Sequence, residues 1–186
     1  MGENKALLPV LRSNAHDCGG TLLDRACEIG RHLLVELGQD EAPLFVSGSF
    51  PGFRSIGDIV PGCGPLSGMH AALNIFLSAR FDCTKPASTK TFDYALFVPV
   101  DMPALKGAAL AHLALSAGNS RAVHYVGFEL PALIRIEPEI ERFLLRRIAP
   151  RPKISMDFSV RALLRDLCAK TIEIESEYQA QFINLN

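Results

Sequence analysis

The sequence predicts an α/β fold, a three-layer sandwich in which helices cover both faces of a mostly parallel sheet. Strand and helix patterns alternate along most of the chain, one strand candidate is apolar throughout, and glycine-rich turns separate strand from helix. No linker or internal repeat divides the 186 residues, of which 48% are hydrophobic. We therefore expect a single domain over residues 1–186.

The helix candidates are amphipathic segments bounded by glycine, proline or polar residues. Residues 21–37 repeat apolar side chains three and four positions apart until Gly38, where a helix is expected to end. Further helices are predicted at 65–80, 104–117, 138–148 and 158–169. Pro138 suits the first position of a helix, because its missing N–H is not needed there.

The strand candidates are short apolar runs between turn residues. They lie at 43–46, 56–60, 94–100, 122–126, 130–136, 172–174 and 182–185. The run at 94–100 is apolar throughout, as expected of a strand buried on both faces of a parallel sheet. The polar stretch at 81–91 predicts a surface loop.

Charge and hydropathy argue against two kinds of partner. The formal net charge of −1 offers no basic surface for nucleic acid. No stretch reaches the roughly 18–20 apolar residues of a membrane span, and residues 1–5 lack the layout of a signal peptide, so we expect a cytoplasmic protein. The five cysteines lack metal-site spacing and are interpreted as reduced thiols, with Cys63 notable because it lies in the motif described next.

Two strand ends carry the candidate chemistry, since ligands of parallel sheets gather at the carboxyl ends of strands. Residues 61–68 place three glycines and two prolines in a tight turn that opens into a helix, leaving backbone N–H groups unshielded. Such a surface suits a nucleotide or phosphate. The alternative is a glycine-rich turn that binds no ligand.

The second candidate is Asp101, which follows the apolar run at 94–100. A carboxylate at the end of a buried strand is costly without a compensating cation, and Mg²⁺ is the natural one. The alternative is that Asp101 caps a helix starting near Pro103.

Four segments, taken in order, resemble the molybdenum cofactor guanylyltransferases within the Rossmann-like nucleotidyltransferases. Residues 1–9 look like the tail of the family signature, which reads Leu-Ala-Gly-Gly, a few residues, Arg-Met-Gly, two residues and Lys. The other three segments are 61–68, 99–103 and 182–186. Their order and spacing are more specific than any single motif, and the resemblance covers most of the chain.

The resemblance implies a role for each matching residue. Lys5 neutralises the triphosphate, and Asp101 holds Mg²⁺. Asn184 and Asn186 match the family's Asn-x-Asn near the metal and the acceptor. The guanine and ribose are contacted by Gly64, Pro65, Leu66, Ser67 and Gly68. The residues alone leave plainer roles open, namely a solvated lysine near a chain end and asparagines that form turns.

The implied reaction is attack by the terminal phosphate of molybdopterin on the α-phosphorus of GTP, with release of pyrophosphate. That nucleophile is already an anion near neutral pH, so catalysis requires alignment and charge neutralisation by Mg²⁺ and lysine rather than a protein base. His70 and His124 are accordingly interpreted as packing or surface residues. The implied partners are GTP, molybdopterin and other molybdenum cofactor proteins, and the oligomeric state stays open.

A basic cluster is a further candidate for binding the acceptor's phosphate. It comprises Arg146, Arg147, Arg151 and Lys153. A solvated helix end explains the first two equally well.

The chain departs from the family pattern at both ends. It begins at the Met-Gly that closes the family's glycine-rich loop, so the first strand and most of that loop are expected to be absent, which would leave two strand edges unpaired. Three explanations compete: translation that starts upstream of Met1, a trimmed chain, or a degenerate relative, and we rank the upstream start first. Asn186 also stops where the family usually continues with Thr-Pro and a helix.

Three rival functions stay open at this stage. A cytidylyltransferase of the same cofactor pathway is the nearest, although Gly64 to Gly68 resembles the guanylyl branch more closely. A sugar-phosphate or methylerythritol nucleotidyltransferase is a weaker alternative. A degenerate, non-catalytic nucleotide-binding protein belongs to a different class.

Overall fold

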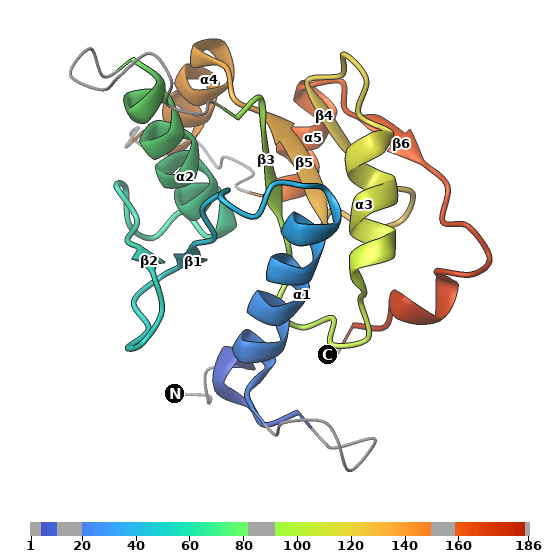
Figure 1. Ribbon diagram of the computed structural model, residues 1–186. Coiled ribbons are helices and arrows are strands. Elements are labelled where there is room, and N and C mark those ends of the chain that lie inside the picture. The colour runs from blue at the N-terminus through green and yellow to red at the C-terminus, as the bar shows by residue number, and fades with distance from the viewer. Residues whose placement is uncertain (1–4, 11–19, 82–91, 150–158, 185–186) are drawn as a thin grey trace.

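The computed structural model describes residues 5–10, 20–81, 92–149 and 159–184, and it confirms the α/β class (Figure 1). Helices α1 (Leu22–Glu36) and α3 (Gly107–Leu115) cover one face of the central sheet. Helices α2 (Pro65–Arg80), α4 (Pro138–Ile148) and α5 (Val160–Asp166) cover the other. The molecule is therefore a three-layer sandwich.

The central sheet has four strands in the order β3 (Tyr94–Phe97), β5 (Ala132–Arg135), β4 (Ala122–Tyr125) and β6 (Lys170–Ile172). Strand β5 runs antiparallel to both of its neighbours, whereas β4 and β6 are parallel. Three of the four strands therefore share one direction, as the sequence predicts.

A second, parallel sheet pairs β1 (Val46–Ser47) with β2 (Ser55–Ile56). Among the residues that the structure describes, β1 and β3 each pair on one side only.

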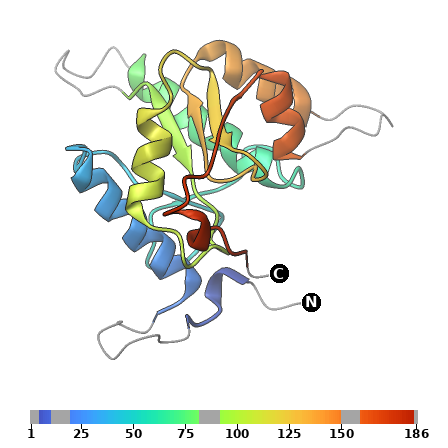
Figure 2. The ribbon, with the colours of Figure 1, turned by 90° about the vertical axis from the view of Figure 1, so that its right-hand side faces the viewer.

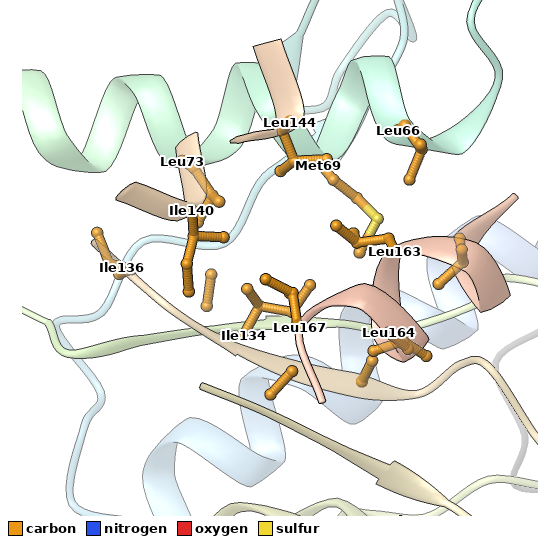
Figure 3. Close-up of a cluster of buried hydrophobic side chains, with 14 of the residues drawn as sticks. Leu66, Met69, Leu73, Ile134, Ile136, Ile140, Leu144, Leu163, Leu164 and Leu167 are labelled. Atoms are coloured by element: carbon orange, nitrogen blue, oxygen red, sulfur yellow. The ribbon is translucent and has the colours of Figure 1, made fainter. Parts of the chain in front are cut away.

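Successive side chains of the central strands pack alternately into two separate hydrophobic cores, one on each face of the sheet. Ala132 and Ile134 of β5 face the core under α2, α4 and α5, while Leu133 between them faces the core under α1 and α3. Figure 3 shows the first core, in which Leu66, Met69 and Leu73 of α2 meet side chains from α4, α5 and β5. These contacts fix the start of α2 over the sheet.

Most predicted helices are confirmed, and the differences have local causes. Helix α2 matches the predicted 65–80, and α1 begins at a capping box in which Thr21 and Asp24 bond to each other's backbone N–H. Helix α3 begins at Gly107, three residues later than predicted. Strand β3 ends at Phe97 instead of residue 100, because Pro99 has no N–H to offer a ladder.

The remaining strand predictions are only partly correct. Strands β1 and β2 are two residues long and shifted from 43–46 and 56–60. The strand predicted at 182–185 is wrong for the described residues 182–184, which follow a 3₁₀ turn, η2 (Gln179–Gln181). Phe182 packs into an aromatic cluster there, so tertiary contacts replace a strand ladder. The predicted loop at 81–91 lies outside the described residues except for Phe81.

The structure places His70, His124 and three of the cysteines. His70 is buried in α2 beside Glu141 of α4, and the Nδ1 of His124 lies 2.7 Å from the Phe128 carbonyl oxygen. Cys27, Cys63 and Cys168 are free thiols, whereas Cys18 and Cys83 lie outside the described residues. In the described part of the chain, no helix combines the length and apolarity needed to cross a bilayer.

Candidate functional site

A small apolar cluster, here called the junction cluster, joins the segments that carry the predicted site residues. Its members are Ala6, Leu23, Cys27 and Val46, with Leu44, Phe50, Phe53 and Val100 packed against them. Ala6 follows Lys5 in the chain, and Val100 precedes Asp101. The cluster therefore brings the neighbours of both predicted catalytic residues into one packed unit.

The same cluster reaches the glycine-rich turn through β1. Val46 precedes Ser47, and a Cβ added to Gly68 would overlap the Ser47 Oγ and lie 3.0 Å from the Ser47 Cβ. Only glycine allows the first turn of α2 to pack so closely on the end of β1. The Asp58 carboxylate lies beside this contact, 3.8 Å from the position of that added Cβ.

Within the turn, the side chains divide between the core and the surface. Leu66 is fully buried, and the buried Ser67 hydroxyl donates to the Val60 carbonyl, which holds the turn against the helix. Gly64 and Pro65 are exposed, and Gly64 has φ 60° with open space beside it. Gly64 and Pro65 therefore face outward, at the start of a helix that no side chain caps.

Asp101 lies in a turn four residues after the end of β3 and is partly exposed. Its carboxylate makes no hydrogen bond or ion pair with any residue that the structure describes. The interpretation of Asp101 as a helix cap is wrong, because α3 begins at Gly107 and its N-cap is Lys106. The carboxylate is thus available to a ligand or a cation.

Lys5 is exposed and begins the 3₁₀ turn η1 (Lys5–Leu7). This segment runs beside the start of α1, where the Leu22 N–H donates to the Leu8 carbonyl at 2.9 Å and the Val10 N–H donates to the Gly20 carbonyl at 2.9 Å. Burial of Ala6 in the junction cluster then places Lys5 on the side of the molecule where β3 ends.

The C-terminal segment meets the loop that carries Asp101. The buried Gln181 side chain accepts a hydrogen bond from the Lys106 N–H at 3.0 Å, and Phe182 shares a core with Met102. Asn184 is exposed two residues further on, and Asn186 lies outside the described residues. Figure 2 shows this segment descending from β6 to the end of the molecule where α3 begins.

The basic cluster does not belong to this edge of the sheet. Arg146 lines a pocket of about 320 Å³ with Arg121, which directly precedes β4. Because β4 runs parallel to β3, Arg121 lies at the edge where β3 begins, opposite the edge where Asp101 follows it. Arg147 is paired with Asp166 at 3.0 Å. Arg151 and Lys153 lie outside the described residues.

The donor set fits a cation that a nucleotide helps to hold. Within the described residues, no group of three or more His, Cys, Asp or Glu side chains could hold a metal ion by itself. Mg²⁺ in nucleotide sites is commonly bound by one or two carboxylates together with substrate phosphates. The single unpaired carboxylate of Asp101 matches that requirement.

Two residues of this region, Ser47 and Gln181, belong to no sequence motif. Ser47 and Gln181 take part only through contacts with residues distant in sequence, Gly68 and Lys106. The Ser47-Gly48 pair after an apolar run was a usable signal for a strand end. Gln181 carries no sequence signal, since nothing local predicts its burial.

Comparison with known proteins identifies the family of the chain. Residues 1–143 match the family described as MobA-like NTP transferase domain. Over all 186 residues the chain is 28% identical to the molybdenum cofactor guanylyltransferase of Xanthomonas euvesicatoria pv. vesicatoria (strain 85-10), covering 82% of that protein.

The fold is also similar to a solved structure. The crystal structure of an Aquifex aeolicus VF5 protein superposes with a TM-score of 0.52 and 15% identity, over 72% of this chain and 62% of that chain. At this identity the likeness concerns the fold alone. The family match covers most of the chain and includes the glycine-rich turn and Asp101. The chain belongs to the MobA-like NTP transferase family, whose members are nucleotidyltransferases.

Proposed function

We propose that this chain transfers GMP from GTP to molybdopterin, with release of pyrophosphate, in molybdenum cofactor biosynthesis. Its family and the name of its Xanthomonas relative support this reaction. One observation carries the proposal: Asp101 has a carboxylate without a described protein partner, beside the junction cluster that links η1, β1 and the end of β3.

In this proposal each residue has a distinct task. The exposed residues Gly64 and Pro65 face the nucleotide, while Leu66, Ser67 and Gly68 hold the turn in shape from inside. Lys5 offsets negative charge on the triphosphate. Asn184 and Asn186 orient the acceptor.

Catalysis in this arrangement is alignment and charge neutralisation. When bound, Mg²⁺ supplies neutralisation of the charge that develops between the α-phosphorus and the leaving pyrophosphate. Asp101 would hold that ion, and Lys5 would bring a second positive charge to the nucleotide's phosphates. The acceptor phosphate already carries the attacking oxygen as an anion, so no protein group has to remove a proton.

Calorimetric titration with GTP and with CTP, each with Mg²⁺, tests the nucleotide choice. Tighter binding of GTP supports the proposal, tighter binding of CTP favours the cytidylyltransferase, and the absence of binding favours a degenerate relative. Pyrophosphate release in the presence of molybdopterin then distinguishes an enzyme from a nucleotide-binding protein.

Asp101→Asn tests the carboxylate itself. We expect loss of Mg²⁺-dependent transfer by a factor of about 10² to 10³, because an amide cannot hold the cation equally well. The melting temperature should be unchanged, since Asp101 has no partner among the described residues. Asp93→Asn is the matched control, because Asp93 precedes β3 at the opposite edge and its carboxylate is 3.7 Å from Arg80. Equal activity of the two variants would refute the proposed role.

A further inference from the structure

Gln181 is one of three polar side chains buried in the described part of the chain. Ser67 donates to the Val60 carbonyl and His70 pairs with Glu141, so both join elements of the helix α2 region. The side-chain carbonyl oxygen of Gln181 instead accepts a hydrogen bond from a backbone N–H, that of Lys106. Without this partner the buried amide oxygen would be left unsatisfied, so the contact is favoured.

Lys106 ends the loop that carries Asp101. The loop runs from the end of β3 to Gly107, the first residue of α3, and Lys106 is the N-cap of that helix but caps it with no side chain of its own. The described hydrogen bond inside the loop is from the Leu105 N–H to the Met102 carbonyl, at 3.2 Å. Gln181 therefore accepts from the backbone N–H of the residue at which the loop passes into the helix.

The segment that presents Gln181 is itself anchored at several points. The Phe182 ring lies 4.8 Å from the Tyr125 ring and 5.0 Å from the Phe128 ring, centroid to centroid. Glu175 lies 3.3 Å from the Nε2 of His112 on α3. The segment thus forms a fixed strap across α3 and β4, and Gln181 is held from both sides.

We propose that Gln181 is a positioning residue, which sets the loop geometry of Asp101 by holding the Lys106 N–H from the C-terminal strap. The proposal rests on the proposed function, in which Asp101 binds the nucleotide's cation. Asp101 has no side-chain partner among the described residues, so its place depends on the backbone of its loop, in which the side chains of Val100 and Met102 pack on either side of it. Strand β3 holds the first end and Gln181 holds the second.

The same strap carries Asn184, the proposed acceptor contact, three residues after Gln181. One hydrogen bond therefore couples the positions of the cation-binding carboxylate and of the acceptor site. Small displacements of reacting groups, on the order of 1 Å, can reduce a rate by about 10²-fold. Loss of the bond should accordingly lower turnover more than nucleotide affinity.

Gln181→Met removes the acceptor oxygen while keeping nearly the same volume, and Gln181→Glu keeps an acceptor oxygen. We expect Gln181→Met to lower kcat about 10- to 100-fold and to raise the Mg²⁺ concentration for half-maximal rate, with KM for GTP changed less than threefold. Gln181→Glu should recover most of the rate. Gln179→Met is the control, since Gln179 is exposed on the same 3₁₀ turn.

Hydrogen exchange of the nucleotide-free protein gives a readout that does not depend on the reaction. Residues 102–107 should exchange at least tenfold faster in Gln181→Met than in the wild type, Gln179→Met or Gln181→Glu. Unchanged exchange there overturns the proposal, as does unchanged kcat in a protein whose Asp101→Asn variant is inactive. If Asp101→Asn stays active while exchange rises in Gln181→Met, the loop contact stands and the proposed function fails.

Discussion

His70 and Glu141 show how one buried polar pair joins two helices. The His70 side chain is 2% exposed, its Nε2 lies 2.8 Å from the Glu141 Oε1, and its Nδ1 has no described partner. His70 lies on α2 just after the glycine-rich turn, and Glu141 lies on α4. The pair therefore fixes the helix that presents the candidate nucleotide surface.

Removing one member should leave the other buried without a partner. We expect Glu141→Ala to lower the free energy of unfolding by about 2 kcal/mol in urea titration. Glu139→Ala is the matched control on the same helix, because Glu139 forms an exposed ion pair with Arg142 at 2.8 Å. Loss of that pair should lower the free energy of unfolding by less than about 0.5 kcal/mol.

The double variant His70→Leu with Glu141→Leu separates pairing from packing. Because it removes both polar groups, it should cost less than the sum of the two single changes. Additive losses would show that the two side chains stabilise the protein independently.

At the scale of elements, the contact between β1 and α2 depends on a glycine. Gly68 lies in the first turn of α2, and an added Cβ would meet the Ser47 side chain at the end of β1. Helix α2 also packs against α4, so it cannot move away freely from the smaller sheet. The close approach links the two-stranded sheet to the layer above the central sheet.

Gly68→Ala should therefore destabilise the protein by about 1–3 kcal/mol, measured by chemical denaturation. Adding Ser47→Gly removes the atoms that the new methyl group meets and should restore most of that loss. Gly57→Ala is the control, because an added Cβ there has no atom within 4 Å. If Gly68→Ala were as stable as Gly57→Ala, the contact would be looser than the geometry implies.

At the scale of the whole molecule, the cores under α1, α3 and the junction bury groups that become charged in alkali. Burial, followed by the charges of Tyr178 and Glu175, raises the pKa of Tyr125 to about 12. Burial likewise raises the pKa of the Cys27 thiol above its ordinary value of 9.0. Both groups are neutral when protonated, so the folded protein holds their protons more tightly than the unfolded chain does.

Stability from Tyr125 should be fully present below the ordinary pKa of 10.0 and be lost as the pH rises from 10 to about 12. The loss should be on the order of 1 kcal/mol at the upper end of that range. Tyr125→Phe should be less stable than the wild type at neutral pH, because it removes the hydroxyl that Tyr125 donates to the Ala109 carbonyl at 2.7 Å. Its free energy of unfolding should then fall less steeply between pH 10 and 12, and an equal slope would contradict the assignment.

Local pattern was enough to predict the elements whose signals are periodic or conformational. Helix α2 appeared with its observed bounds because Gly64 and Pro65 set its start and its apolar face repeats along the helix. The strand predicted at 94–100 was too long, because Pro99 cannot extend the ladder beyond Phe97. The strand predicted at 182–185 does not form over residues 182–184, where Phe182 packs against Tyr125 instead. Strand length depends on partners elsewhere in the chain, which a local pattern does not contain.

The sequence by itself determined the α/β class, the glycine-rich turn and the carboxylate after β3, since each depends on residue type and on near neighbours. Only the tertiary structure decided that Asp101 caps no helix, that Ser67 and Gly68 face inward, and that the basic cluster lies at the other edge of the sheet. It also joined Gln181 to Lys106, 75 positions apart. Such pairings follow from how packed layers bring distant backbone together, because a buried polar group must find its partner in space and not along the chain.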